Sequence, residues 1–177
     1  QLDDKPLVKH IFFAGYEWKV KSGHYNPGDN DWLANNVWVD GDGFLHLKIT
    51  CEGSQWYCAE LSTVKSFGYG TYQFQVIGAV DQLDPNIVLG LFVYPGSENP
   101  DEGNELDIEY AKWGKVDGPI GNYTVVPSEA TYHFPCLLNG NYTTHQFIWT
   151  DDQVLFQSFH GHAVKDEMEF ANWLYRT

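Results

Sequence analysis

The sequence predicts an all-β sandwich. Short segments in which apolar and polar residues alternate recur along the chain, and Gly, Pro, Asn and Asp separate them. No segment predicts a helix, and no repeat or linker divides the 177 residues. Because a chain of this length buries one sizeable core, we expect a single domain over residues 1–177.

In the N-terminal part we read residues 1–10 as a loose arm, and residues 22–31 and 51–57 as loops rich in turn residues. The turn at Gly41-Asp42-Gly43 predicts a β-hairpin. Four strands are expected here, in residues 10–20, 36–40, 44–50 and 58–63.

The remaining sequence predicts eight further strands. They are expected in or near residues 69–77, 87–94, 104–110, 122–126, 130–134, 144–150, 154–160 and 168–173. Residues 95–103 are expected to form a polar loop before the third of these strands. Residues 87–94 carry an aliphatic face, read as core, and a face with Phe92 and Tyr94, read as a sugar-facing wall. The alternative for this strand is burial of both faces between two sheets.

The strand predicted at 104–110 carries an acidic cluster. Glu105, Asp107 and Glu109 alternate with apolar residues, so their side chains share one face of the strand. The other face carries Leu106, Ile108 and Tyr110, which would anchor the strand in a core. Three neighbouring carboxylates repel, so we expect them to titrate as a coupled set that retains a proton above the usual carboxyl pKa.

Two readings of the acidic cluster remain open at this point. Glycoside hydrolysis needs two carboxyl groups beside the scissile bond, and a third acid between them can share a proton with the nucleophile. The other reading is a solvated acidic face or a cation site, because calcium prefers oxygen ligands. His160 and His162 lack a third ligand, so no transition-metal site is expected. His133 and His145 are read as cross-strand or core partners.

Composition excludes several other function classes. The net charge of −14 argues against nucleic acid and anionic membranes as partners. The longest apolar run, residues 87–94, has the length of a strand, so we expect no membrane span. No nucleotide-binding motif is present. The three cysteines cannot all pair, which leaves either a Cys51–Cys58 disulfide or three free thiols.

Residues 105–109 resemble the E-x-D-x-E signature of glycoside hydrolase family 16, in the uninterrupted form typical of lichenases and xyloglucan-modifying enzymes. Further lichenase-like segments occur in the family's order at residues 32–37, 45–49, 58–60 and 67–72. The resemblance covers most of residues 16–149. It implies a concanavalin-like β-jelly-roll of two antiparallel sheets, with a substrate cleft on the concave face.

By resemblance, Glu105 matches the nucleophile, Asp107 the assisting acid and Glu109 the general acid/base. The matching substrate-binding positions are Glu60, Phe92, Tyr94, Asn122 and Trp173. Trp113 joins this set because it lies in phase with the acidic residues along the strand. Two positions depart from lichenases, which have Trp where this chain has Gly103 and Arg where it has Ser62.

The resemblance implies a retaining endo-β-glycanase that hydrolyses a mixed-linkage β-1,3-1,4- or β-1,3-glucan through a covalent intermediate. A non-catalytic, lectin-like sandwich and a transglycosylase are the alternatives. The expected partner is a polysaccharide or oligosaccharide. The protein is expected to be a secreted monomer that requires no cofactor, with a structural calcium ion as an option.

The spacing of the two glutamates raises a geometric question. Four residues of flat strand separate their Cα atoms by roughly 13 Å. A retaining pair needs carboxyl groups about 5–5.5 Å apart. The prediction therefore requires Glu105 and Glu109 to lean together on a concave, twisted sheet.

Overall fold

The structure, a computed structural model, describes residues 7–95 and 105–177. It divides into two compact units, Gln1–Phe67 and Gly68–Thr177, which are described separately below. Strands dominate both units, and the described helices are three single 3₁₀ turns, at Ala34–Asn36, Val80–Gln82 and Asp166–Met168. The predicted all-β class is confirmed, whereas the single domain over residues 1–177 stays a prediction. None of the described helices is long and apolar enough to cross a membrane.

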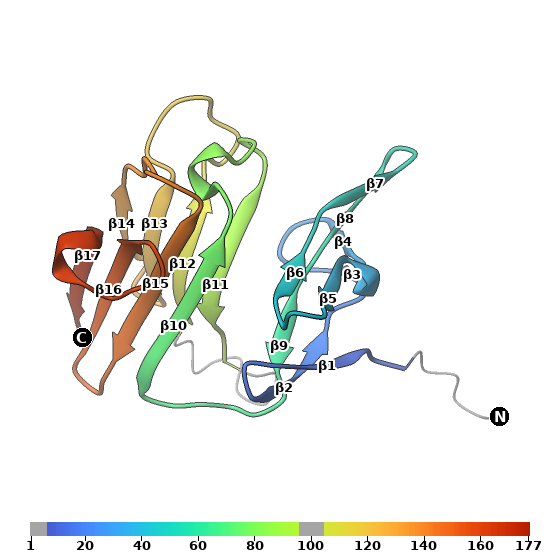
Figure 1. Ribbon diagram of the computed structural model, residues 1–177, viewed down its shortest axis with the longest axis horizontal. Coiled ribbons are helices and arrows are strands. Elements are labelled where there is room, and N and C mark those ends of the chain that lie inside the picture. Colours follow the sequence, from blue (N-terminus) through green and yellow to red (C-terminus); the bar gives the residue numbers. More distant parts are fainter. Residues whose placement is uncertain (1–6, 96–104) are drawn as a thin grey trace. The chain divides into compact units, whose positions relative to one another are not determined.

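The first unit contains three small groups of strands (Figure 1). One antiparallel sheet has the order β1 (His10–Phe13), β2 (Tyr16–Val20), β9 (Leu61–Thr63). A second sheet has the order β3 (Gly23–Tyr25), β4 (Asn30–Trp32), β8 (Gln55–Cys58), β7 (Thr50–Glu52). The third group pairs β5 (Val37–Val39) with β6 (Leu45–Leu47) and confirms the predicted hairpin.

Several sequence predictions for this unit were wrong in detail. The single strand expected over residues 10–20 is a hairpin, because Ala14 and Gly15 adopt φ values of 52° and 82° and reverse the chain. The loop expected at 22–31 contains β3 and β4, and the loop expected at 51–57 contains most of β7 and β8. These strands are three or four residues long, too short for an alternating pattern to stand out.

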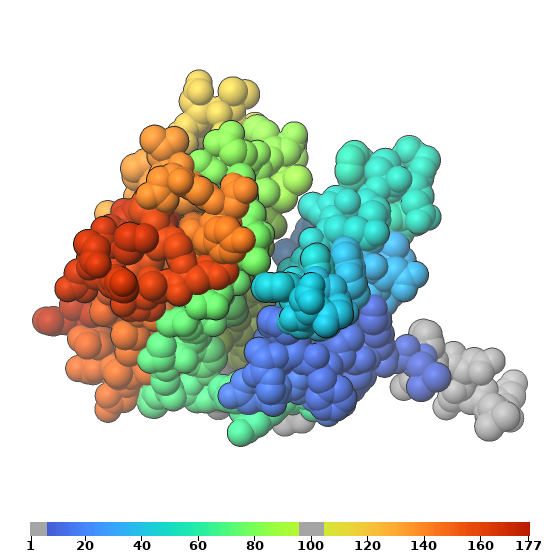
Figure 2. Space-filling model, in the orientation of Figure 1, coloured from blue at the N-terminus to red at the C-terminus, as the bar shows by residue number. Residues whose placement is uncertain are grey.

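The second unit is a sandwich of two four-stranded antiparallel sheets. The first sheet has the order β10 (Gly70–Ile77), β15 (Tyr142–Trp149), β16 (Gln153–His160), β17 (Glu169–Arg176). The second has the order β11 (Val88–Val93), β12 (Glu105–Ala111), β13 (Gly121–Val126), β14 (Ala130–Phe134). Figure 1 shows the first sheet in front of the second, and in Figure 2 side chains cover the front of this unit. All eight predicted strands are confirmed, with bounds that differ by a few residues.

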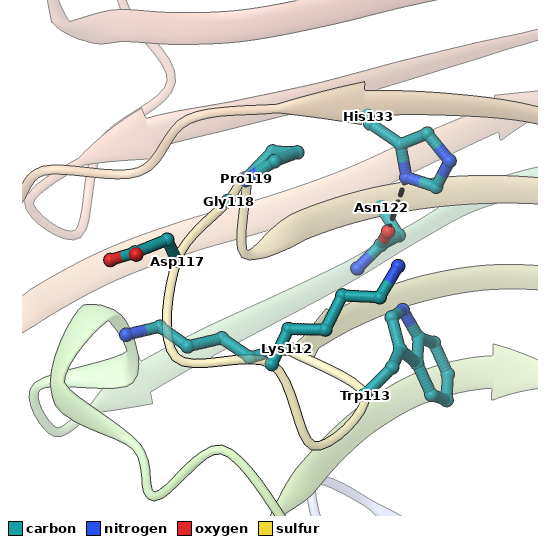
Figure 3. A pocket seen from close by; sticks show the side chains of 8 residues that line it. Lys112, Trp113, Asp117, Gly118, Pro119, Asn122 and His133 are labelled. Atoms are coloured by element: carbon teal, nitrogen blue, oxygen red, sulfur yellow. Dashed lines mark hydrogen bonds between the residues drawn. The ribbon is translucent and has the colours of Figure 1, made fainter.

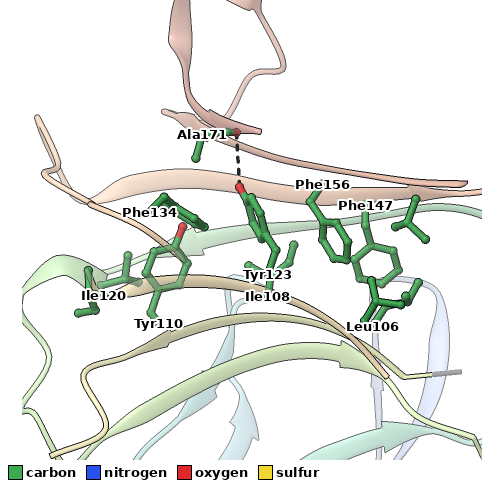
Figure 4. Close-up of a cluster of buried hydrophobic side chains, with 12 residues drawn as sticks. Leu106, Ile108, Tyr110, Ile120, Tyr123, Phe134, Phe147, Phe156 and Ala171 are labelled. Carbon is green, nitrogen blue, oxygen red and sulfur yellow. Dashed lines mark hydrogen bonds between the residues drawn. The ribbon is translucent and has the colours of Figure 1, made fainter. Parts of the chain in front are cut away.

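The core of the second unit lies between these two sheets (Figure 4). Leu106, Ile108 and Tyr110 from β12 are buried there, as predicted, and they meet Phe147 of β15 and Phe156 of β16. Fully burying a large apolar side chain contributes about 1.5–3 kcal/mol. The apolar face of β12 therefore fixes the opposite, acidic face in position.

A buried polar network joins the two sheets. The Tyr123 hydroxyl donates a hydrogen bond to Ser158 Oγ at 2.7 Å, and Ser158 Oγ lies 2.9 Å from His145 Nδ1. The Tyr110 hydroxyl lies 3.1 Å from the same nitrogen. Burial lowers the pKa of His145 to about 3, so the imidazole is neutral. The network thus connects β12 and β13 of one sheet with β15 and β16 of the other. It confirms His145 as a core partner.

Candidate functional site

The three acidic side chains lie on the face of β12 that points away from the core. Asp107 is paired with Phe92 of β11 on one side and with Thr124 of β13 on the other. Glu109 is paired with Gly90 and Asn122 in the same way. Asp107 is only 9% exposed, and the two glutamates are partly exposed on either side of it. The predicted acidic face of this strand is confirmed.

Burial raises the pKa of all three carboxyl groups, and repulsion adds to the shifts of Asp107 and Glu109. The pKa of Asp107 rises to about 8, first because of burial, then because of the charges of Glu105 and Glu109, and last through a hydrogen bond with Glu105. Burial is also the main cause of the raised pKa of Glu105 and of Glu109, and the charge of Glu105 adds to the latter. The cluster therefore retains protons at pH values where ordinary carboxyl groups have lost them.

This arrangement can hold neighbouring carboxyl groups in different protonation states. Near neutral pH Asp107 carries a proton and donates a hydrogen bond to the carboxylate of Glu105. This hydrogen bond lowers the pKa of Glu105 against the effect of burial and so favours its carboxylate form, which is capable of nucleophilic attack. Glu109 has a raised pKa and is able to act as a general acid. The charge of Glu105 adds to the raised pKa of Glu109, while the approach of the two carboxyl groups that a retaining pair requires stays a prediction.

The neighbouring strand β11 presents aromatic side chains on the same face. Phe92 is paired with Asp107 and is 41% exposed, and Tyr94, just beyond the strand, is 63% exposed. Leu89 and Leu91 on the other face pack against the core. The predicted core face of β11 is confirmed and the alternative of two buried faces is wrong, while the reading of the aromatic face as a sugar-facing wall stays a prediction.

Asn122 was predicted to contact substrate, but the structure gives its amide other partners. The residue is 2% exposed, and its Nδ2 group lies 3.0 Å from the carbonyl oxygen of Ile120 and 3.3 Å from that of Glu109. Its Oδ1 atom lies 2.6 Å from His133 Nδ1. Asn122 thus connects the backbone of the acidic strand to His133 of β14.

His133 and Asn122 line a pocket of about 170 Å³ at the end of β12 (Figure 3). The other lining residues are Lys112, Trp113, Lys115, Asp117, Gly118 and Pro119. Trp113 is 54% exposed and reaches the pocket from the loop after β12. The sequence predicted His133 only as a cross-strand partner. His133 lies beside the acidic strand because it is paired with Asn122, which is paired with Glu109. The alternation of residues within each strand does not predict this pairing between strands.

Within the second unit, the structure places one predicted substrate-binding residue, Trp173, away from the face of the acidic cluster. Trp173 lies in β17 of the other sheet, where its ring stacks on Phe156 with centroids 5.6 Å apart and packs against the core. Glu60 lies in the first unit, where its carboxylate accepts a hydrogen bond from Lys21 Nζ at 2.9 Å. Gly103, the departure from the lichenase pattern, lies outside the described residues.

Within residues 7–95 and 105–177, no group of three or more His, Cys, Asp or Glu side chains has the geometry to hold a metal ion. The cysteines Cys51, Cys58 and Cys136 are free thiols. Of the two possibilities left by the sequence, the structure therefore has three free thiols and no Cys51–Cys58 disulfide.

Comparison with known proteins places the chain among relatives of beta-glucanases. It is 31% identical over 102 residues to a "Beta-glucanase" of Paenibacillus macerans, an alignment that covers 56% of this chain and 42% of the relative. It is 25% identical over 146 residues to the "Endo-1,3-1,4-beta-glycanase ExoK" of Rhizobium meliloti, covering 78% of this chain and 53% of the relative. The chain thus spans about half the length of the curated relatives it matches. No protein-family model matches it.

Solved structures show the same fold. A Bacillus licheniformis beta-glucanase superposes with a TM-score of 0.64 at 21% identity, over 93% of this chain and 78% of that protein. A prokaryotic beta-1,3-1,4-glucanase (lichenase) from a mouse hindgut metagenome gives a TM-score of 0.63 at 24% identity, over 92% and 79%. The predicted resemblance to lichenases and the predicted jelly-roll fold are confirmed.

Proposed function

We propose, from this relationship to beta-glucanases, that the chain is a glycoside hydrolase that cleaves a β-glucan internally and with retention of configuration. The observation that carries the proposal is the set of three carboxyl groups with raised pKa values on the solvent face of β12. Retaining glycosidases need one ionised and one protonated carboxyl group at the scissile bond. Glu105, Asp107 and Glu109 supply both states in one strand.

In the first step, the Glu105 carboxylate attacks the anomeric carbon and forms a glycosyl ester. The bond between that carbon and the glycosidic oxygen breaks, and the leaving oxygen takes the proton of Glu109. Asp107 donates its hydrogen bond to Glu105 and keeps the nucleophile oriented. In the second step, Glu109 accepts a proton from water, the water oxygen attacks the anomeric carbon, and Glu105 leaves as a carboxylate.

The exposed aromatic residues Phe92 and Tyr94 provide an apolar wall beside the acidic cluster on which sugar rings can stack. Trp113 provides a third aromatic surface beyond Glu109. The names of the relatives favour a mixed-linkage β-1,3-1,4-glucan, with β-1,3-glucan as the second choice. We further propose that the protein acts as a secreted monomer on a polysaccharide or oligosaccharide, without a required cofactor.

A lectin-like binding module of the same fold is less well supported. Burying Asp107 between two other carboxyl groups raises its pKa to about 8, which is an energetic cost that sugar binding alone does not require. A transglycosylase fits equally well in its first step, because it uses the same glycosyl ester. It differs only in that a sugar hydroxyl replaces water in the second step.

The test is the release of reducing ends from barley β-glucan, laminarin, xyloglucan, agarose and carrageenan by the wild-type chain and by Glu105→Gln. We expect hydrolysis of barley glucan or laminarin by the wild type and none by the variant. Binding of a glucan without hydrolysis by the wild type would favour the lectin-like module. Equal activity in both proteins would exclude Glu105 as the nucleophile.

A further inference from the structure

We propose that the pocket at the end of β12 binds the sugar on the leaving-group side of the scissile bond, with Trp113 stacking on the ring and His133 Nε2 accepting a hydrogen bond from a sugar hydroxyl. This inference rests on the proposed function and assigns residues that its mechanism does not use. The ligand class is a neutral pyranose within a β-glucan chain.

The hydrogen bonds around Asn122 determine which nitrogen of His133 carries the proton. Three backbone carbonyl oxygens lie 3.0–3.4 Å from Asn122 Nδ2, so this atom must be the amide nitrogen that donates to them. The atom facing His133 is then the amide oxygen, which only accepts hydrogen bonds. His133 Nδ1 therefore carries the proton and donates it over 2.6 Å.

In the neutral imidazole, the second nitrogen is consequently an acceptor. Because Nδ1 is engaged with a residue that is itself buried, the ring has a fixed orientation in the wall of the pocket. A sugar hydroxyl donates a hydrogen bond to such a nitrogen directly. Asn122 acts as a positioning residue, and His133 is the group that contacts the ligand.

Trp113 occupies a backbone conformation that is unfavourable for a large side chain. Its φ is 52° and that of Gly114 is 75°, and Lys115 N donates a hydrogen bond to Lys112 O at 2.9 Å. This is a tight turn with two left-handed residues, in which Asn or Gly is preferred at the position of Trp113. The indole is nevertheless 54% exposed, so burial in the core does not compensate for the strain. A strained, exposed aromatic residue at the rim of a pocket indicates a ligand contact.

The register of the sheet places the pocket on the side of Glu109. Glu109 is paired with Asn122, and Asn122 is paired with His133, whereas Glu105 is paired with Val126 at the other end of β13. In the proposed mechanism Glu109 gives its proton to the leaving oxygen. The sugar attached to that oxygen is therefore the one closest to the pocket.

Two variants separate a ligand contact from a structural role. His133→Asn keeps an amide donor for Asn122 Oδ1 but removes the Nε2 acceptor. Trp113→Asn removes the indole and installs a residue that the turn prefers. Glu129→Asn is the matched control, because Glu129 also has a left-handed φ of 55° but lies in the turn between β13 and β14, outside the pocket.

The variants are compared on two substrates with the same non-reducing sugars. One is a β-glucan oligosaccharide, whose leaving group is a sugar, and the other is the corresponding β-oligosaccharyl fluoride, whose leaving group is fluoride. We expect each pocket variant to lower kcat/KM about tenfold on the oligosaccharide, the effect of one lost contact, and to leave the fluoride unchanged. Glu129→Asn should change neither value.

Thermal unfolding gives a second, independent readout. Trp113→Asn should raise the Tm, as should Glu129→Asn, because both relieve left-handed strain. Equal losses on both substrates, no loss on either, or a lower Tm for Trp113→Asn would overturn the inference. If the wild type hydrolyses both substrates, the proposed function stands even when the pocket inference fails. A wild type that cleaves neither substrate would overturn the proposed function itself.

Discussion

Replacing Asp107 by Asn should stabilise the folded protein, and the gain should grow as the pH rises. Asp107 is buried between Glu105 and Glu109, and its pKa rises from 3.8 to about 8 on folding. Between these two values the unfolded chain has lost this proton while the folded chain retains it. The contribution of Asp107 to stability therefore falls as the pH increases, whereas an amide at this position is neutral in both states.

The magnitude follows from the size of the shift. One pKa unit corresponds to 1.36 kcal/mol, so Asp107 lowers the free energy of unfolding by about 1.4 kcal/mol for each pH unit between pH 4 and pH 8. Relative to the wild type, Asp107→Asn should gain about 2.7 kcal/mol between pH 5 and pH 7. The variant also keeps a hydrogen-bond donor for Glu105, which limits other changes.

Urea denaturation of both proteins at pH 4, 5, 6 and 7, followed by tryptophan fluorescence, measures this difference. The value at pH 4 is the internal baseline, because Asp107 is protonated in the folded state and half protonated in the unfolded state there. A difference between the two proteins that does not change with pH would mean that Asp107 is ionised in the folded state. Our account of how it supports Glu105 would then be wrong.

Three further predictions concern the catalytic roles, the core and the packing of the sheets. With azide and an aryl β-oligosaccharide, Glu105→Ala should give an α-glycosyl azide and Glu109→Ala a β-glycosyl azide; exchanged products, identified by proton NMR, would reverse the two roles. Since burial lowers the pKa of His145 to about 3, this residue should cost the folded protein about 1.4 kcal/mol per unit as the pH falls from 6.5 to 4, so that urea denaturation should show His145→Gln gaining stability relative to the wild type by that amount per unit; a difference that does not change with pH would contradict a neutral, buried His145. Gly121→Ala should lower the Tm, because the added methyl group would overlap the ring of Phe134; an unchanged Tm would mean that β14 moves without cost.

The acidic face of β12 could be predicted because both of its faces have a strong chemical signature. Leu106 and Ile108 are buried in the core, so alternation alone places Glu105, Asp107 and Glu109 on the other side. The source of the pKa shifts was only partly predictable. The sequence indicates repulsion between the carboxyl groups, whereas burial, the larger cause, depends on neighbouring strands.

The first unit shows where local patterns fail. The three residues of β3, Gly23–Tyr25, are all exposed, so no buried apolar side chain marks this strand. Its pairing with β4 and the parallel pairing of β4 with β8 depend on contacts between distant segments. Turn-rich composition predicts a loop for such a segment even where backbone hydrogen bonds form a sheet.

Single site residues were predicted with uneven success for the same reason. The alternation that was extended to Trp113 does not continue that far, because β12 ends at Ala111 and a tight turn follows. Trp113 reaches the site through this turn instead. Trp173 was assigned by resemblance, and its stacking on Phe156 in the core has no signal in the local sequence. His133 required the register of three strands.

The central claim is that Glu105 forms a covalent bond to the sugar. Proton NMR of the first turnovers on a soluble β-glucan oligosaccharide tests it most directly, because two displacements at the anomeric carbon restore its original configuration. The account predicts that the β-anomer appears first and that the α-anomer follows only by slow mutarotation. An α-anomer formed first would mean that water attacks the sugar directly, and Glu105 would not be the nucleophile.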